Sequence, residues 1–308
     1  MQKIELLFLI LILCIVTITT DLLRITMTSL YDRLTDEQKG KLDWGELSAN
    51  TAERAIHLLA ENLDKVYWPW LSANPAAIGI LRDNLDKVCW ISISRNPAAM
   101  DIIEQHLDLV CWDGLSGCPE AIHIIRQNLH RVNWKWLSSN HAAIDILEQN
   151  LEKVDWHVLS QNTKASHILL QNFDKIDWVW LSNNTGAISI LEQHIDKINW
   201  QILSRNPAAI PILEQYIDKI NWEWLSENPA AIPILEQHLD KVNWTMLSLN
   251  PAAISILYEH IDDVQWGFIA INHNPDNIPL IEQHLDHVPL ERLSGNPALF
   301  APSCYLIQ

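Results

Sequence analysis

Histidines recur at one position of this chain, and a row of imidazoles could hold a series of metal ions. The position holds His106, His194, His238, His260 and His284, and in other copies Asn62, Asn84, Asn128, Asn150, Asn172 and Tyr216. Zinc needs its donors at about 2.0–2.3 Å, whereas equivalent positions on packed helices lie about 9–10 Å apart. Because Asn and Tyr also exchange with His, we predict no metal site. We expect these side chains to bond the last carbonyl groups of a helix.

A row of carboxylates could support acid–base catalysis, because stacked carboxylates raise one another's pKa. The row consists of Asp64, Asp86, Asp108, Asp174, Asp196, Asp218, Asp240, Asp262 and Asp286. Lysines follow directly at positions 65, 87, 153, 175, 197, 219 and 241. Their charge offsets that of the carboxylates. We therefore interpret the two rows as a solvated charge ladder, in which the aspartates also cap a turn.

Serines that follow a leucine, such as Ser72, Ser94 and Ser116, also recur at one position. A catalytic nucleophile occurs once and needs a base and an orienting group beside it. The two segments that depart most from the repeat, residues 113–118 and 267–274, do not supply such a set. The sequence also contains no Gly-rich phosphate loop, CxxC pair or HExxH motif. We predict that the protein is not an enzyme and has no catalytic, cofactor or metal site.

Tryptophans could form a stacking platform for bases or sugars. All 15 occupy two positions of the repeat: eleven belong to its Trp-x-x-Leu-Ser motif, and Trp70, Trp136, Trp180 and Trp224 lie two residues further on. The formal net charge of −17 would repel the phosphates of nucleic acid. We therefore expect these rings to fill the gaps between units as core. We expect any partner to be a protein, and the acidic charge favours a basic one.

The motif has a fixed period, which is typical of solenoid proteins. Trp68 and the nine motif tryptophans after it, up to Trp266, are spaced by 22 residues; Trp44 precedes this run by 24 and Leu290 follows it by 24. The consensus unit is W-x-x-L-S-x-N-P-A-A-I-x-I-L-E-Q-H-L-D-K-V-N. The sequence therefore predicts an all-α solenoid of about 12 two-helix units.

The longer helix of each unit has clear signals. In one copy Asn206 is an N-cap and Pro207 the first helical residue. Ile210, Leu213, Ile217 and Ile220 then fall on one face of a helix, and Ile212 widens the apolar stripe. Pro211, Pro233 and Pro279 would interrupt such a helix. We expect the helix to begin one turn later in those units.

The shorter segment around each motif tryptophan is either a helix or a strand. A strand would give a β/α horseshoe resembling leucine-rich repeats. Asp or Asn precedes the tryptophan at positions 43, 133, 155, 177, 199, 221 and 243, as in helix N-caps. Pro69, Asp113 and Gly267 follow it, and a central strand excludes proline. These residues favour the all-helical alternative.

The N-terminus differs from the repeat. Leu6–Thr20 is uncharged and apolar, which predicts that residues 1–26 form a hydrophobic segment with a membrane anchor within residues 4–25. A cleaved signal peptide, and a true start at Met27, are alternatives. Residues 27–42 form a polar linker or N-terminal cap, residues 43–300 the solenoid, and residues 301–308 a C-terminal tail.

Five cysteines are present. Cys89 and Cys111 occupy equivalent positions in neighbouring units, and their expected separation exceeds the roughly 7 Å that a disulfide allows. Free thiols indicate a reducing compartment. We expect a membrane-associated protein with its array in the cytoplasm, or alternatively a soluble cytoplasmic protein.

The unit between Leu225 and Trp244, LSENPAAIPILEQHLDKVNW, resembles a repeat in proteins of large nucleocytoplasmic DNA viruses. That repeat reads L-S-x-N-P-x-A-I-x-L-L-E-x-N-x-x-K-I-x-W, and the match covers residues 43–300. The resemblance implies a viral or virus-derived repeat protein, and it assigns no active residues. We expect a protein-binding or scaffold protein. The alternatives are a structural array without a specific partner and, less favoured, a hydrolase built on the array. The surface predicted to vary most is the position after each motif tryptophan and the position five after it.

Overall fold

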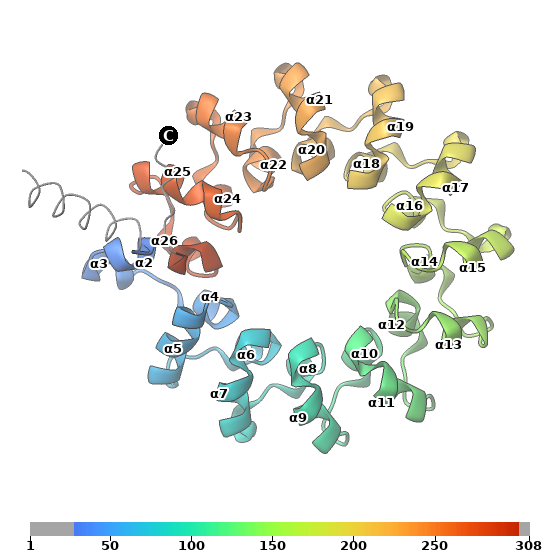
Figure 1. Cartoon of the computed structure of the whole chain (residues 1–308), viewed down its shortest axis with the longest axis horizontal. Coiled ribbons are helices and arrows are strands. Elements are labelled where there is room, and N and C mark those ends of the chain that lie inside the picture. Colours follow the sequence, from blue (N-terminus) through green and yellow to red (C-terminus); the bar gives the residue numbers. More distant parts are fainter. Residues whose placement is uncertain (1–27, 302–308) are drawn as a thin grey trace, which may run out of the picture.

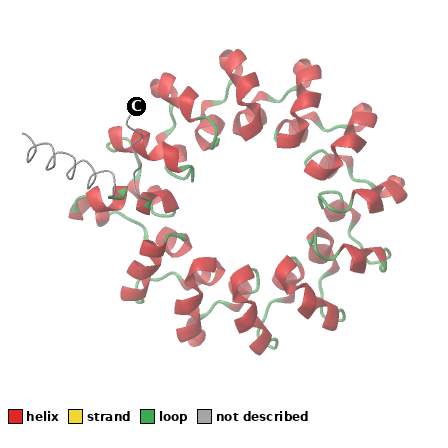
Figure 2. Ribbon diagram, in the orientation of Figure 1, coloured by secondary structure: helices red, strands yellow, loops and turns green. Residues whose placement is uncertain are grey.

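The computed structural model describes residues 28–301, and these form short helices joined by turns. Figure 2 shows helices and loops throughout this part of the chain, and residues 28–301 contain no strand. The predicted all-α solenoid of two-helix units is therefore confirmed, and the β/α horseshoe is wrong. We number the units 1 to 12 from Trp44, Trp68, Trp90, Trp112, Trp134, Trp156, Trp178, Trp200, Trp222, Trp244, Trp266 and Leu290.

The units form a closed ring with two layers (Figure 1). The inner layer consists of α4 (Trp44–Ala49), α6 (Trp68–Ala73), α8 (Trp90–Ile93), α10 (Trp112–Ser116), α12 (Trp134–Ser139), α14 (Trp156–Leu159), α16 (Trp178–Leu181), α18 (Trp200–Ser204), α20 (Trp222–Glu227), α22 (Trp244–Leu249), α24 (Trp266–Ile269) and α26 (Leu290–Leu293). The outer layer consists of α5 (Glu53–Glu61), α7 (Ile78–Asp83), α9 (Met100–Gln105), α11 (Ile122–Gln127), α13 (Ile144–Glu148), α15 (Ser166–Gln171), α17 (Ile188–Gln193), α19 (Ile210–Gln215), α21 (Ile232–Gln237), α23 (Ile254–Glu259) and α25 (Ile278–Gln283).

Short 3₁₀ turns complete most units. One set precedes the outer helices: η1 (Pro75–Ala77), η3 (Pro97–Ala99), η4 (Pro119–Ala121), η6 (Thr185–Ala187), η8 (Pro207–Ala209), η10 (Pro229–Ala231) and η13 (Pro275–Asn277). A second set follows them: η2 (Leu85–Lys87), η5 (Phe173–Lys175), η7 (Ile195–Lys197), η9 (Ile217–Lys219), η11 (Leu239–Lys241) and η12 (Ile261–Asp263). The last turn is η14 (Pro297–Phe300).

The inner helices begin where the sequence predicts. The residue before the tryptophan is an N-cap whose side chain accepts a backbone N–H at Asp43, Asn133, Asp155, Asp177, Asn199, Asn221 and Asn243. Pro69 lies in the first turn of α6, where its missing N–H costs no helical bond.

The outer helices are shorter than predicted. The Asn-Pro-Ala-Ala segment forms a 3₁₀ turn, and α19 begins only at Ile210, so Pro211 falls in its first turn. The later start expected for the proline-containing units is thus confirmed, and units without that proline share it. A single helix running to Ile220 is wrong, because α19 ends at Gln215 and η9 follows. Ile220 is nevertheless buried, as are Ile212 and Leu213.

Buried serines join each unit to the next. The Ser182 hydroxyl donates to the Trp178 carbonyl in its own inner helix at 2.8 Å and accepts the Asn199 N–H of the next unit at 3.0 Å. The same pair of bonds recurs from Ser48 to Ser248. Ala270 replaces the serine in unit 11, and Pro289, the residue that would donate to it, has no N–H. Catalysis is therefore not needed to explain why serine recurs at this position.

Buried asparagines form a second set of bonds between units. The Asn184 side-chain amide donates to the carbonyls of Ser160 (2.9 Å) and Asn162 (3.2 Å) in the preceding unit, while its oxygen accepts the Gly186 N–H. The equivalent asparagines also bond to the preceding unit, although Asn162, Asn206 and Asn228 donate only to its serine carbonyl. Cys118 stands at this position in unit 4 and cannot donate in this way.

The same bonds close the ring. Ser294 of unit 12 accepts the Asp43 N–H at 2.8 Å, and its carbonyl accepts from the Asn50 side chain at 2.9 Å. Unit 1 therefore packs on unit 12 as any unit packs on its predecessor. We call this contact between units 12 and 1 the seam.

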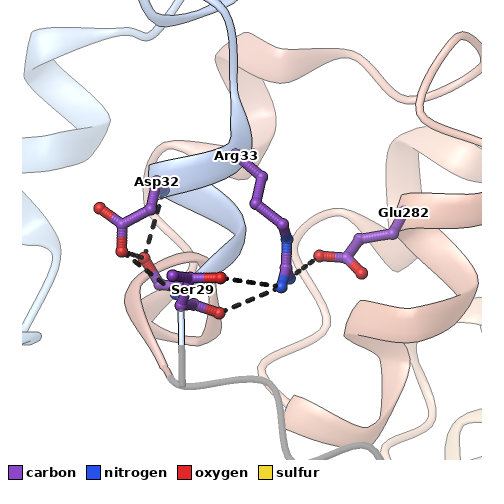
Figure 3. A network of polar contacts seen from close by, with 5 residues as sticks. Ser29, Asp32, Arg33 and Glu282 are labelled. Atoms are coloured by element: carbon purple, nitrogen blue, oxygen red, sulfur yellow. Dashed lines mark hydrogen bonds and ion pairs between the residues drawn. The ribbon is translucent and has the colours of Figure 1, made fainter. Parts of the chain in front are cut away.

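The segment before unit 1 adds to the seam. It forms two one-turn helices, α2 (Leu30–Arg33) and α3 (Asp36–Lys39). Tyr31 of α2 packs on Phe300 of η14 with ring centroids 4.9 Å apart. Arg33 pairs with Glu282 of α25, and Ser29 and Asp32 form a capping box that begins α2 (Figure 3). Asp32 also pairs with Arg54 of α5 at 2.6 Å, so the polar segment predicted as linker or cap contacts both ends of the array.

The predicted membrane anchor within residues 4–25 lies outside the described residues, as do Cys14 and Cys304. Between residues 28 and 301 no helix has the length and apolar character needed to cross a membrane.

Candidate functional site

The motif tryptophans are half-buried rather than fully buried, and they pack against the core. Lys153 lies 4.8 Å from the Trp134 ring and Lys241 4.8 Å from the Trp222 ring. Five of the seven lysines in the predicted row lie over tryptophan rings, and Lys197 and Lys219 lie near the aspartate that precedes them. The expectation that these rings fill the gaps between units holds only in part, because each keeps an exposed portion.

Trp178→Ala should lower the free energy of unfolding by about 2–3 kcal/mol, since a half-buried ring loses part of the roughly 3–5 kcal/mol typical of a core aromatic. The ring contacts Phe173 and His194 with centroids 5.3 and 5.4 Å away. Urea unfolding followed by circular dichroism measures the loss. Val179→Ala, at a neighbouring side chain that is 46 % exposed, should change it by less than about 1 kcal/mol. Equal small losses at both positions would show that Trp178 contributes no packing.

The predicted histidine row packs on these tryptophans. His106, His194, His238 and His260 meet the motif tryptophan of their own unit with centroids 5.0–5.4 Å apart. The asparagines of this row instead donate to a carbonyl four residues earlier, as Asn84 does to Ile80 at 2.9 Å. The predicted carbonyl bonds are therefore confirmed for asparagine, and for histidine the ring contact takes their place.

The aspartate row caps no inner helix, because the residue before the tryptophan does so. Within the part of the chain that the structure describes, no three His, Cys, Asp or Glu side chains gather as metal ligands.

The second set of tryptophans lies on the inner helices, and two of its four rings are exposed. We call Trp70, Trp136, Trp180 and Trp224 the inner tryptophans. Trp70 is 42 % exposed and Trp136 is 41 % exposed, and the other two are half-buried. The prediction that all tryptophans are core is wrong for Trp70 and Trp136, and it holds only in part for Trp180 and Trp224. Residues two apart on a helix point in widely different directions, so only one of the two can face the core.

Arginines lie over two of the inner tryptophans. The Arg95 guanidinium is 5.4 Å from the Trp136 ring centroid, and that of Arg205 is 5.1 Å from Trp224. Arg95 reaches Trp136 across Gly114, where a Cβ would lie 2.9 Å from the Arg95 Cγ. Unit 4 therefore has glycine at the position that holds an inner tryptophan in other units, and a side chain there would block the arginine.

Two hollows flank Trp136. One, of about 380 Å³, is lined by Arg95, Asp113, Cys118 and Glu120 together with Trp136 and Ser139. The other, of about 470 Å³, is lined by Lys135, His157, Gln161 and Trp180 together with the same Trp136 and Ser139. A third hollow, of about 400 Å³, adjoins Trp70. The hollows bring together aromatic faces and charges of both signs, an arrangement that suits polypeptide side chains.

No protein-family model matches this chain, and neither a curated protein nor a solved structure does.

The positions predicted to vary lie on these same inner helices or directly after them. Ile91 and Val179 follow motif tryptophans and are 66 % and 46 % exposed. Arg95, Ser139 and Arg205 occupy the position five residues after one. Sequence reasoning placed this variable surface, and it missed the inner tryptophans beside it.

The cysteines differ in environment. Cys89 and Cys111 are free thiols, as predicted, and so is Cys118. Burial, together with the Glu120 carboxylate 3.3 Å from its sulfur, raises the pKa of Cys118 to about 11. A hydrogen bond with the Ser92 hydroxyl lowers the pKa of Cys89.

Iodoacetamide at pH 8 should therefore alkylate Cys89 well before Cys118, since the thiolate is the nucleophile. Peptide mass spectrometry of the folded protein measures both rates. The Cys118 rate should climb as the pH approaches 11. Because its folded-state pKa is raised, the thiol's contribution to stability is complete below the usual thiol pKa and is lost as the pH rises toward about 11. Glu120→Gln should speed alkylation of Cys118 alone; equal rates for both thiols in wild type would contradict the assignment.

Proposed function

We propose that this protein is a binding ring, which holds a polypeptide partner against its inner helices and acts as a scaffold. The observation that carries the proposal is the exposure of the inner tryptophans among variable, charged residues. Elsewhere the repeated residues are used to join units: Ser182 and Asn184 are fully or almost fully buried and bonded to neighbours. Aromatic and arginine side chains are the residues that contribute most at protein interfaces.

The acidic composition supports a basic partner, because complementary charge speeds and orients association. Tethering to a membrane through residues 4–25 and an origin in a large DNA virus belong to the same proposal. Both rest on the sequence alone.

The experiment compares an inner and an outer surface. Full-length protein, immobilised, is exposed to an extract of the cells in which it is made, and retained polypeptides are identified by mass spectrometry. The double variant Trp136→Asp, Trp180→Asp should lose them. Leu170→Asp, at a residue on outer helix α15 that is 57 % exposed, should keep them. The proposal would be overturned if both variants retained the same polypeptides. It would also be overturned if wild type and both variants retained none.

A further inference from the structure

Trp70 differs from the other inner tryptophans in the charge beside it. It lies in the hollow of about 400 Å³ that Glu46, Ala49, Ala73, Asn74 and Pro75 complete. Glu46 occupies, in unit 1, the position that holds tryptophan in four other units, and it is the only carboxylate there in the array. In the described part of the chain its side chain makes no ion pair. The hollow therefore joins an aromatic ring to an uncompensated negative charge.

The chain itself shows what such a ring accepts. Both arginines occupy the position five residues after a motif tryptophan. Arg205 lies over Trp224 of the next unit, and Arg95 lies over Trp136, which is two units further along the chain. The corresponding residues for Trp70 are Ala49 and, across the seam, Gly295. Neither has a side chain that can reach the ring, and no lysine or arginine of residues 28–301 lies over it.

Neighbouring groups leave the carboxylate available. Arg292, the residue of unit 12 equivalent to Glu46, donates to the Gly267 carbonyl at 3.2 Å and lies 5.7 Å from the Phe268 ring, so it is turned toward unit 11. Tyr67 meets Trp70 edge-on with centroids 5.4 Å apart and is 49 % exposed. It stands where seven units carry an Asp or Asn N-cap, so unit 2 has an aromatic pair in place of a helix cap.

We propose that the hollow between Glu46 and Trp70 binds an arginine side chain of a basic polypeptide partner. The guanidinium stacks on the Trp70 ring, as Arg95 and Arg205 do on theirs, and its N–H groups donate to the Glu46 carboxylate. The net charge of −17 attracts such a partner at longer range. This inference rests on the proposed function and names the partner's chemistry and one point of contact.

The test uses full-length protein and a fluorescein-labelled hexa-arginine peptide, with binding followed by fluorescence anisotropy at about 150 mM salt. Trp70→Leu should weaken binding about 3- to 30-fold, the range that a cation–π contact covers. Trp70→Phe, which keeps an aromatic face, should lie between wild type and Trp70→Leu. Glu46→Gln should weaken binding about 2- to 5-fold.

Tyr258→Leu is the matched control, because it removes an aromatic ring that is 43 % exposed on outer helix α23, and it should bind like wild type. Circular dichroism of each variant establishes that the ring is folded. Equal affinity of wild type, Trp70→Leu and Glu46→Gln would overturn the inference, and so would an equal loss in Tyr258→Leu. Either result leaves the cell-extract experiment on Trp136 and Trp180 to decide the proposed function separately.

Discussion

Asn184→Ala should lower the free energy of unfolding by about 3–5 kcal/mol, more than most single substitutions in this chain. The side chain is 1 % exposed. Its loss leaves the carbonyls of Ser160 and Asn162 without this donor and removes the acceptor for the Gly186 N–H. An unsatisfied buried group costs about 1–3 kcal/mol, and a lost cap about 1 kcal/mol.

The control lies next to it. Asn183 is exposed, so Asn183→Ala should change the free energy of unfolding by no more than about 0.5 kcal/mol. The midpoint of urea unfolding reports both changes, and comparing midpoints avoids assuming that a repeat array unfolds in one step. Similar midpoints for the two variants would mean that the bonds between units contribute little.

Phe300→Asp should open the ring. Phe300 is 8 % exposed and its ring packs on Tyr31. The substitution removes a buried aromatic side chain, a loss of about 3–5 kcal/mol, and places a carboxylate in a buried site. Small-angle X-ray scattering should show a larger radius of gyration, because units 12 and 1 separate.

The matched control is Leu170→Asp, which adds the same charge on an exposed outer position away from the seam. Its radius of gyration should equal that of wild type. Both variants should keep the helical circular dichroism of wild type, since no unit is removed. If Phe300→Asp scatters like wild type, the polar bonds from Ser294 to Asp43 and Asn50 hold the seam without the aromatic contact.

Local features of the fold could be predicted because single residues determine them. Asn133 and Asp177 cap helices by their own side chains, and Pro69 fits only the first turn of a helix. The period of the tryptophans determined the number of units. The division of the outer segment into a turn and a helix was predicted only where Pro211, Pro233 or Pro279 required it.

Closure of the ring could not be predicted in this way, because curvature is the sum of small rotations over all units and no residue specifies it. The sequence does contain a signal for the roles of Ser182 and Asn184. Polar residues that recur at fixed positions of a repeat face the same neighbours each time, which predicts bonds between units. The sequence also contains a signal for the exposure of Trp70 and Trp136, since two positions two residues apart cannot share a helix face.

Closure at Ser294 also limits how this chain can change in length. An open solenoid gains a unit at either end or in the middle without disturbing the rest. Here every unit already has a neighbour on both sides, so an inserted copy would have to be accommodated by a smaller bend at all the other junctions. The 22-residue segments beginning at Trp200 and Trp222 are identical at 16 positions, as after a duplication of one of them. If one of them arose by such an event, the ancestor with one unit fewer was either a tighter ring or an open arc.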